Sequence, residues 1–271
     1  MTAGGHFFAK VIRAWRQDVR HCHFRRDTGA ALPFLIGLGW IPCVVAACFP
    51  ARLDAQSANV SGAVALSSQL VDRGLAITPA TPTLQGAVSW TSIGGWSFGV
   101  SASTKIRSSG HIAEEQIQAS RYWILSSDWQ MQASLLSYNY PGSARSRVFN
   151  RTETSVDWMY RDVLTFGLSA VRLIDGKNHR PRGAADVNVN WPLRWNVSVS
   201  TGAGVAQSLV ARYPASEYGY ENTYRYAHAG LTWAQGPWRI GLDRIVTSAS
   251  ARRQWGNLAA SPWVATISRS F

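Results

Sequence analysis

The chain has 271 residues, and its 27 Lys and Arg residues outnumber its 15 Asp and Glu residues, which gives a formal net charge of +12. This length fits one large domain or two small ones. A basic balance of this kind is typical of nucleic-acid-binding proteins, but here the basic residues are scattered singly, with no Lys/Arg-rich helix and no zinc-ligand spacing. The composition therefore argues against nucleic acid as a partner.

Residues 1–55 are predicted to be an N-terminal extension that ends in a secretion signal. Arg25 and Arg26 precede an apolar stretch at 30–47, and residues 53–55 offer a small-residue cleavage site. We therefore expect residues 56–271 to form the mature domain.

Two other interpretations of this segment stay open. A transmembrane anchor would need an uninterrupted apolar helix, and Pro33 and Pro42 interrupt this one. Residues 45–48 also resemble a lipoprotein cleavage box, in which Cys48 would carry the lipid. The cysteines all lie within the first 48 residues, so the predicted mature chain is cysteine-free, as suits an exported protein.

From Val60 onward, polar and apolar residues alternate. Asp186, Asn188 and Asn190, for example, alternate with Val187 and its apolar neighbours. This period of two indicates β-strands with one polar and one apolar face. The pattern predicts twelve strands, at 58–71, 82–91, 96–104, 114–126, 129–140, 151–160, 163–173, 184–191, 195–204, 223–234, 238–247 and 262–271.

The connections between these strands alternate in length. Connections after even-numbered strands are short, and those after odd-numbered strands are long, which is the pattern of bacterial outer-membrane barrels with short periplasmic turns. An even number of strands also places both ends of the chain in the periplasm. The long connections lie at 72–81, 105–113, 141–150, 174–183, 205–222 and 248–261.

Pairs of aromatic residues flank the short turns. Trp90 and Trp96, for instance, lie on either side of the turn at 91–95, both on the apolar face. A soluble β-sandwich also alternates, but amphipathic rings around turns are typical of barrels, where they lie at the membrane interface. We therefore predict an all-β fold, a transmembrane antiparallel up-and-down β-barrel of about 12 strands in the bacterial outer membrane. The predicted membrane girdle is Trp90, Trp96, Trp123, Trp129, Trp158, Trp191, Trp195, Trp233 and Trp238.

The chain ends in Phe271. Trp263, Ala265 and Ile267 share a face with this residue, and an aromatic last residue is typical of the strand that outer-membrane assembly machinery recognises. Arg269 interrupts that face, but an Arg near the interface can extend its charge into water at modest cost. The sequence thus predicts contact with the assembly machinery through the terminal strand.

Three segments resemble the TorF-type family of proteobacterial outer-membrane porins. The most specific is NVSGAVALSSQLVDRGLAITPATPTLQGAVSWTSIGGWSFGVSAS at 59–103, with the Arg73-Gly74 step, Pro82 and Gly86. LLSYNYPGS at 135–143 and the terminal ISRSF also match. The chain departs from the family in its strongly basic character and in Leu70, where an aromatic residue is usual. The resemblance implies a barrel and a pore, and it carries no established substrate and no catalytic residue.

The inward positions of such a barrel are polar. Small polar side chains favour a wet channel over an apolar plug, and twelve strands enclose a lumen narrower than that of the 16–18-stranded porins. We therefore predict passive diffusion of small solutes, without a cofactor, a metal or a catalytic residue. The predicted pore lining is Gln118, Gln132, Glu153, Asp157, Asp186, Asn188, Asn190, His228, Arg239 and Asp243.

Basic residues gather in the long connections. They could form a positive mouth that concentrates anions, or they could bind the phosphates of lipopolysaccharide in the outer leaflet. The sequence does not decide between an anion-preferring entrance and a lipid-binding rim. The predicted basic mouth is Lys105, Arg107, Arg145, Arg147, Lys177, Arg180 and Arg182, and Arg73 is expected in the same long loops.

Two rival functions remain. A plugged barrel with a structural or adhesive role would share every pattern above and would differ in conducting no ions. An outer-membrane lipid-modifying enzyme needs a His-activated nucleophile, but His111 and His179 lie in expected loops, His228 is expected to face the lumen, and no GxSxG turn accompanies them.

Overall fold

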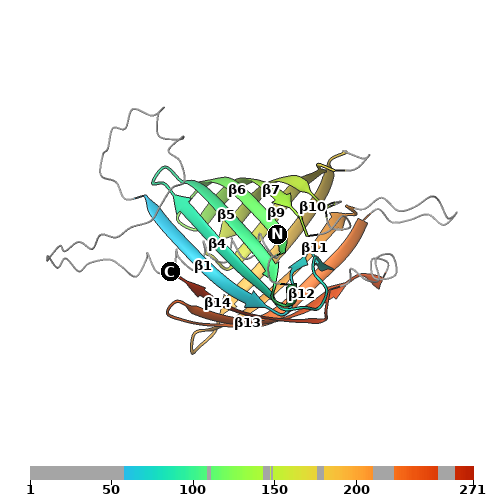
Figure 1. The fold of residues 1–271 in the computed structure, drawn as a ribbon. Helices are drawn as coiled ribbons and strands as arrows, with labels where there is room; N and C mark the ends of the chain where they lie inside the picture. The colour runs from blue at the N-terminus through green and yellow to red at the C-terminus, as the bar shows by residue number, and fades with distance from the viewer. Residues whose placement is uncertain are drawn as a thin grey trace, which may run out of the picture.

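The computed structural model describes residues 58–108, 111–142, 147, 149–175, 180–209, 223–249 and 260–271. Within these ranges, twelve antiparallel strands form one closed barrel, and a short hairpin forms a second sheet (Figure 1). The predicted signal at 1–55 and Cys48 lie outside the described residues. The barrel strands are β1 (Asn59–Ser67), β4 (Thr83–Thr91), β5 (Trp96–Lys105), β6 (Ile112–Ile124), β7 (Trp129–Asn139), β8 (Arg151–Tyr160), β9 (Leu164–Leu173), β10 (Arg182–Pro192), β11 (Val197–Gln207), β12 (Thr223–Gln235), β13 (Trp238–Thr247) and β14 (Trp263–Ser270).

The twelve predicted strands each correspond to one barrel strand, so the predicted all-β barrel is confirmed. Several predicted strand ends differ from the observed ones by one to four residues, and two of these differences have a clear structural cause. The first strand ends at Ser67 rather than at residue 71, because the chain then turns into the lumen. The ninth starts at Val197 rather than at residue 195, because Trp195 and Asn196 adopt left-handed φ angles of 58° and 60° and form the turn instead.

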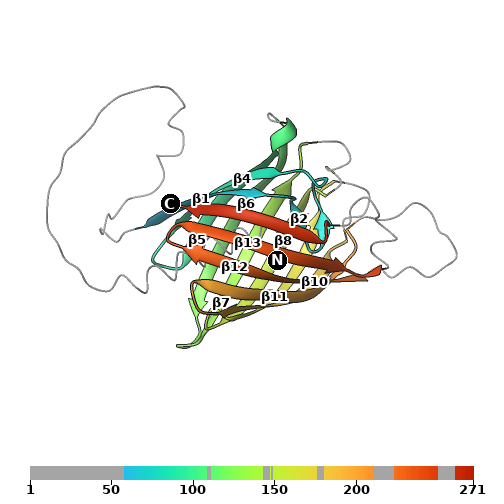
Figure 2. The same ribbon diagram turned by 90° about the horizontal axis from the view of Figure 1, so that it is seen from below.

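The ring closes where the first and last strands meet. β1 pairs with β14 from Ala63↔Ser270 to Ser67↔Thr266, and the C-terminus lies beside β1 in both views (Figures 1 and 2). Beyond this ladder, the Gly62 amide donates to the Phe271 carbonyl at 2.9 Å, and the Phe271 amide donates to the Gly62 carbonyl at 3.0 Å. The Phe271 ring lies over Gly62, where a Cβ atom would come within 2.5 Å of a ring carbon. The Phe271 ring therefore packs directly on the backbone of Gly62, where a side chain would leave no room for it.

The outer face of the barrel is apolar. Val60, Val100, Ile117 and Leu135 are more than half exposed, and each lies on the outward-facing set of its strand. Aliphatic side chains could not cover so much surface in water without an aggregation hazard, whereas a hydrocarbon layer accommodates them. Among the described residues, no helix is long and apolar enough to cross a bilayer.

The tryptophans of the expected girdle lie near the short turns. Trp90, Trp96, Trp129, Trp191, Trp195, Trp233 and Trp238 are exposed, and Trp123 and Trp158 are half-buried. Neighbouring side chains partly bury Trp123 and Trp158. The Arg121 guanidinium lies 5.3 Å from the Trp123 ring centre. Trp158 packs against Phe166, with ring centres 5.9 Å apart.

Outward arginines near these turns stack on the tryptophans. Arg121 lies 5.2 Å from the ring centre of Trp96, and Arg269 lies 5.5 Å from that of Trp238. Stacking lets each side chain lie along an apolar surface while its charge reaches the interface. Arg269 therefore interrupts the terminal apolar face without leaving its charge in hydrocarbon.

An exposed ion pair joins two of the short turns. Arg161 donates from Nε and Nη2 to the two carboxylate oxygens of Asp128 at 2.9 and 3.1 Å, and its backbone amide donates to the Asp128 carbonyl at 2.9 Å. The hydrogen bonds from the Arg161 guanidinium lower the pKa of Asp128 from its ordinary value. Because both groups are exposed, solvent screens the pair and its stabilising effect is small.

The contact between the Phe271 ring and Gly62 gives a first prediction. Replacing Gly62 with Val should displace the terminal ring and weaken the β1–β14 seam, at a cost of about 1–3 kcal/mol from overpacking. Heat-modifiability on cold SDS gels should show a lower unfolding temperature. Gly86→Val is the matched control, since Gly86 pairs with Val64 on the neighbouring strand and nothing lies within 4 Å of its Cβ position. Equal decreases in the unfolding temperature of the two variants would show that packing of the Phe271 ring on Gly62 does not stabilise the β1–β14 seam.

Candidate functional site in the barrel lumen

The segment after β1 turns into the barrel. It forms the hairpin of β2 (Val71–Asp72) and β3 (Leu75–Ala76), turned by Arg73 and Gly74 with φ angles of 47° and 78°. The Gly74 carbonyl accepts a hydrogen bond from Thr247 Oγ1 at 2.8 Å, which ties the hairpin tip to β13. β2 is seen among the barrel strands in Figure 2. We call residues 69–78 the lumen hairpin.

The tip of the lumen hairpin reaches the far wall. Arg73 donates from Nη1 to Glu153 Oε2 at 3.4 Å and from Nη2 to the other carboxylate oxygen, and Nη2 also donates to Ser169 Oγ at 2.7 Å. Ser169 is on β9, which lies opposite β1 in the strand order. The expectation that Arg73 belongs to an outer basic mouth was therefore wrong: its side chain is 4% exposed and paired inside the barrel.

A second buried ion pair fixes the hairpin to the wall. Asp72 accepts a hydrogen bond from the fully buried Arg151 on β8, whose Nε lies 3.9 Å from Glu153 Oε2. The Arg151 guanidinium also lies 4.2 Å from the ring centre of Tyr138. Two cations and two anions thus alternate between hairpin and wall. A charge without its partner would be costly at this depth, so the four residues hold one another in place.

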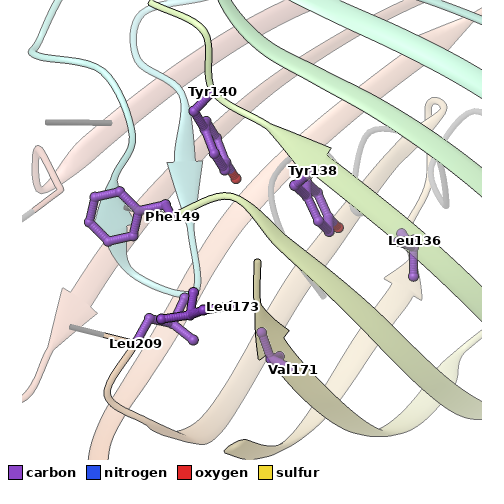
Figure 3. Packing of buried hydrophobic residues seen from close by; sticks show 7 residues of the cluster. All are labelled: Leu136, Tyr138, Tyr140, Phe149, Val171, Leu173 and Leu209. Carbon is purple, nitrogen blue, oxygen red and sulfur yellow. The ribbon is translucent and has the colours of Figure 1, made fainter. Parts of the chain in front are cut away.

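Apolar side chains pack around the hairpin as well. Leu75 packs in a buried cluster with residues of β10, β11 and β12, and Ile77 packs against a second cluster. The second cluster includes Tyr138 and Tyr140 from β7 and the segment after it, which point into the same space in Figure 3. Its members are Leu136, Tyr138, Tyr140, Phe149, Val171, Leu173 and Leu209. The lumen at the loop end is therefore filled by packing as well as by charge.

The residues expected to line the pore fall into two groups. Those on β6 to β10 are buried, with exposed fractions of 4–7%, and comprise Gln118, Gln132, Glu153, Asp157 and Asp186. Those on β10, β12 and β13 are half-buried: Asn188, Asn190, His228, Arg239 and Asp243. The open space beside β6–β10 is therefore smaller than the sequence pattern suggests, because the lumen hairpin packs in this part of the lumen.

Three cavities are lined in part by the lumen hairpin. One, of about 20 Å³, lies between the hairpin and β8–β12, and the other two contact Arg73 at the hairpin tip. The larger of these two has a volume of about 180 Å³ and is lined by β12, β13, β14 and β1, with Arg239 and Asp243 in its wall. The smaller of these two has a volume of about 30 Å³ and lies on the β6–β10 side, where Gln118, Asp157 and Asp186 line it. Arg73 lines both, so the hairpin tip lies between the two spaces.

Inward glycines make room for the polar side chains. A Cβ atom on Gly202 would lie 2.3 Å from Asn188 Oδ1 and 2.5 Å from His228 Cε1, and one on Gly230 would lie 2.2 Å from Asp243 Oδ1. The same Asp243 oxygen accepts a hydrogen bond from Ser200 Oγ at 3.1 Å. Polar side chains therefore fold flat against the wall instead of pointing across the lumen, which widens the space on this side.

The residues of the expected basic mouth are spread over the loop end. Arg107, in the short 3₁₀ helix η1 (Ile106–Ser108), is exposed, as are Arg147 and Arg180. Lys105 and Arg182 are half-buried, and Arg182 donates to the carbonyl of Leu209. Arg145 and Lys177 lie outside the described residues, as does His179.

Sequence reasoning missed the partners of the hairpin. Asp72, Arg151, Ser169 and Tyr138 were not singled out, although Arg151 shares the inward set of β8 with Glu153 and Asp157. The alternation of inward and outward residues along β8 was therefore the sequence feature that could have identified Arg151 as a lumen residue. The Asp72-Arg73-Gly74 step is a hairpin-turn signal as well, but it lies in a long connection, and nothing in the local sequence directs a connection inward.

No family model and no curated protein matches the chain, so its kinship with TorF-type porins stays a prediction. Solved structures do match. The NanC porin is 14% identical over 79% of this chain and 99% of its own, with a TM-score of 0.48. The KdgM porin is 8% identical over 78% and 98%, with a TM-score of 0.46. Pseudomonas aeruginosa OprD is 8% identical over 78% and 66%, with a TM-score of 0.35. These likenesses are too distant to indicate what passes through this barrel.

Proposed function

We propose that this chain is a bacterial outer-membrane pore through which small solutes diffuse passively, with a lumen narrowed at the loop end by its own hairpin. The observation that carries the proposal is the closed ring with an apolar outer face and a polar inner one. Such a ring satisfies its backbone groups inside a bilayer. The cavity of about 180 Å³ beside the hairpin supports a path for small solutes only.

The exposed side chains of the barrel support three partners for the pore. Outer-membrane lipid would contact the apolar face and the Trp–Arg pairs, and lipopolysaccharide phosphates would contact the exposed Arg107, Arg147 and Arg180. The exposed ring of Phe271 on the terminal strand supports recognition by the outer-membrane assembly machinery.

A plugged barrel with a structural or adhesive role is the second candidate. The ion-paired lumen hairpin favours it, because a hairpin that never moves and leaves no continuous path would stop diffusion. The two candidates differ in one measurable property, the conductance of the folded protein.

Conductance is therefore the first test of the proposal. The full chain, expressed in a Gram-negative host and extracted from its outer membranes in detergent, should give stable single-channel steps in a planar bilayer. The steps should be smaller than those of 16–18-stranded porins, because the lumen has fewer strands and an internal hairpin. A heat-modifiable and therefore folded protein that gives no steps would overturn the pore and leave the plugged barrel.

The exposed arginines at the loop end support a positive outer mouth. Replacing Arg107, Arg147 and Arg180 with Gln removes three charges from the surface field. The reversal potential under a KCl gradient should then shift in the direction of greater cation selectivity. The shift should be larger at 0.1 M than at 1 M salt, because at 1 M the charges of the basic mouth are already screened. An unchanged reversal potential at low salt would assign these residues to lipopolysaccharide instead.

The hairpin pairs predict how the conductance is limited. The double substitution Asp72→Asn with Arg73→Gln removes both hairpin charges and leaves Arg151 beside Glu153, so the wall retains a pair. We expect the hairpin to loosen and the single-channel conductance to rise by roughly twofold or more. Asp128→Asn with Arg161→Gln is the matched control, because it removes an exposed pair outside the lumen. A loosened hairpin with unchanged conductance would show that it does not limit the pore.

A further inference from the structure

A groove crosses the lipid-facing surface of the barrel. It has a volume of about 670 Å³ and extends over β9 to β13, of which β10 to β13 lie side by side in Figure 2. The strand register places one outward residue from each of the five strands in a continuous row. The row consists of Phe166, Val187, Ala203, Ala227 and Val246. We call this depression the alanine groove.

The alanine groove runs obliquely across the membrane. At one end of its row, Phe166 is the third residue of β9 and lies close to a short turn. At the other end, Val246 is the last but one residue of β13 and lies close to a long connection. Because short turns face the periplasm and long connections face outward, the groove rises from the periplasmic side at β9 to the outer side at β12 and β13.

Small side chains make the depression. Ala185, Ala203 and Ala227 lie on three adjacent strands in its floor, and Ala203 pairs directly with Ala227. Many other outward positions carry Val, Leu or Ile. Asp186 and Tyr226 contribute to the floor from beneath, since both belong to the inward sets of their strands and also line cavities of the lumen. The surface that the groove offers to the membrane is therefore mostly apolar.

The shape of the groove favours a lipid chain over a second barrel. The wall of a second barrel is convex, so it would touch the larger side chains around the groove and leave the alanines without contacts, which loses dispersion energy. An acyl chain is narrow and flexible enough to enter. The row crosses five strands, or about 19 Å at the usual strand spacing. One chain spans a similar length, since it covers half of a hydrocarbon core of about 30 Å.

One positive charge lies at the outer end of the groove. Arg225 lines it, is exposed, and pairs directly with Val205 on the outward face of β11. Outward Arg121 and Arg269 stack on tryptophans, whereas the Arg225 side chain makes no ion pair or ring contact with any residue that the structure describes. A charge on the lipid-facing surface costs free energy, and a lipid phosphate can offset this cost by accepting two parallel hydrogen bonds from a guanidinium.

We propose that the alanine groove binds one acyl chain of lipopolysaccharide, with a phosphate of the same lipid at Arg225 and the chain directed toward Phe166. The outer end of the groove faces the outer leaflet, where lipopolysaccharide supplies both the chain and the phosphate. The inference deepens the lipid contacts of the proposed function, because it gives lipopolysaccharide one defined site on the barrel. It rests on the place of the barrel in the outer membrane and does not require that the barrel conducts.

A lipid titration tests the site. The full chain in detergent, stripped of bound lipid, would be mixed with increasing lipopolysaccharide, and its unfolding temperature would be followed on SDS gels. A lipid that binds only the folded barrel should raise this temperature by about 3–10 °C at ten to a hundred times its dissociation constant. Dephosphorylated lipopolysaccharide should bind more weakly. No rise, or an equal rise with phosphatidylglycerol, would overturn the assignment to lipopolysaccharide.

The charge and the groove are tested by separate variants. Arg225→Gln removes the guanidinium and should raise the dissociation constant by about tenfold, because a charge-assisted contact with phosphate is lost. Arg172→Gln is its control, since Arg172 is an exposed outward residue of β9 outside the lining of the groove. This control should change the dissociation constant by less than about twofold. Equal losses in the two variants would indicate general attraction to basic residues and overturn the site.

Ala203→Phe fills the groove without changing any charge, so it should also weaken binding by about tenfold. Ala102→Phe is its control, because Ala102 is an exposed outward residue of β5 that pairs with Gly86, beside which there is open space. If Ala203→Phe does not fold, Ala227→Leu fills the same floor with a smaller side chain. Unchanged binding in a folded groove variant would show that no acyl chain lies there.

Conductance separates this inference from the proposed function. A barrel that binds lipopolysaccharide in the expected way but passes no current would refute the pore and leave the lipid site standing. A barrel that conducts, but whose unfolding temperature does not respond to lipopolysaccharide, would refute the lipid site and leave the pore standing.

Discussion

The structure depends on one constraint: in a hydrocarbon layer, every backbone amide and carbonyl must find its partner within the protein. An open sheet cannot meet it, because its two edge strands would each present a row of unpaired groups. The β1–β14 ladder removes both edges, and the reciprocal bonds between Gly62 and Phe271 extend it to the last residue. The alternation of polar and apolar residues follows from this closure, because each strand then has one face toward lipid and one toward the lumen.

Closure also creates the difficulty that the hairpin resolves. A twelve-stranded ring encloses more space than its own inward side chains fill, and here the wall adds several inward glycines. The lumen hairpin occupies part of that space, and its Asp72 and Arg73 pair with Arg151 and Glu153 on β8. The remaining space is uneven. It is wide between the hairpin and β12–β14 and narrow beside β6–β10, where Asp157 and Asp186 line the smaller cavity.

The barrel was predictable because its determinants are local and repeated. The same closed barrel is indicated by three features: twelve alternating segments, a regular sequence of short and long connections, and tryptophans beside the turns. The inward-facing residues of β8 and β10 followed from the alternation alone. The ends of individual strands were less certain, since Trp195 and Asn196 continue the alternation but adopt left-handed turn conformations.

The interior of the lumen was not predictable in the same way. Whether a loop lies over the mouth or folds inward is decided by partners far along the chain, and alternation says nothing about such partners. Arg73 illustrates the limit: its neighbours in sequence are those of a surface loop, and only the position of Glu153 on the opposite wall explains its burial. The positions of Asp157 and Asp186 likewise depend on the strand register, which pairs both residues with Gly167 on β9.

The long sequence separation of the hairpin contacts has a consequence for the order of assembly. Asp72 and Arg151 are 79 residues apart, Arg73 and Glu153 are 80 apart, and Arg73 and Ser169 are 96 apart. None of these contacts can form until β8 and β9, the sixth and seventh of the twelve barrel strands, have been added to the sheet. Until then, the four charges remain hydrated, which removes the cost of leaving any of them buried alone. The lumen hairpin can therefore exchange the water around its charges for ion pairs only after half of the barrel strands are in place.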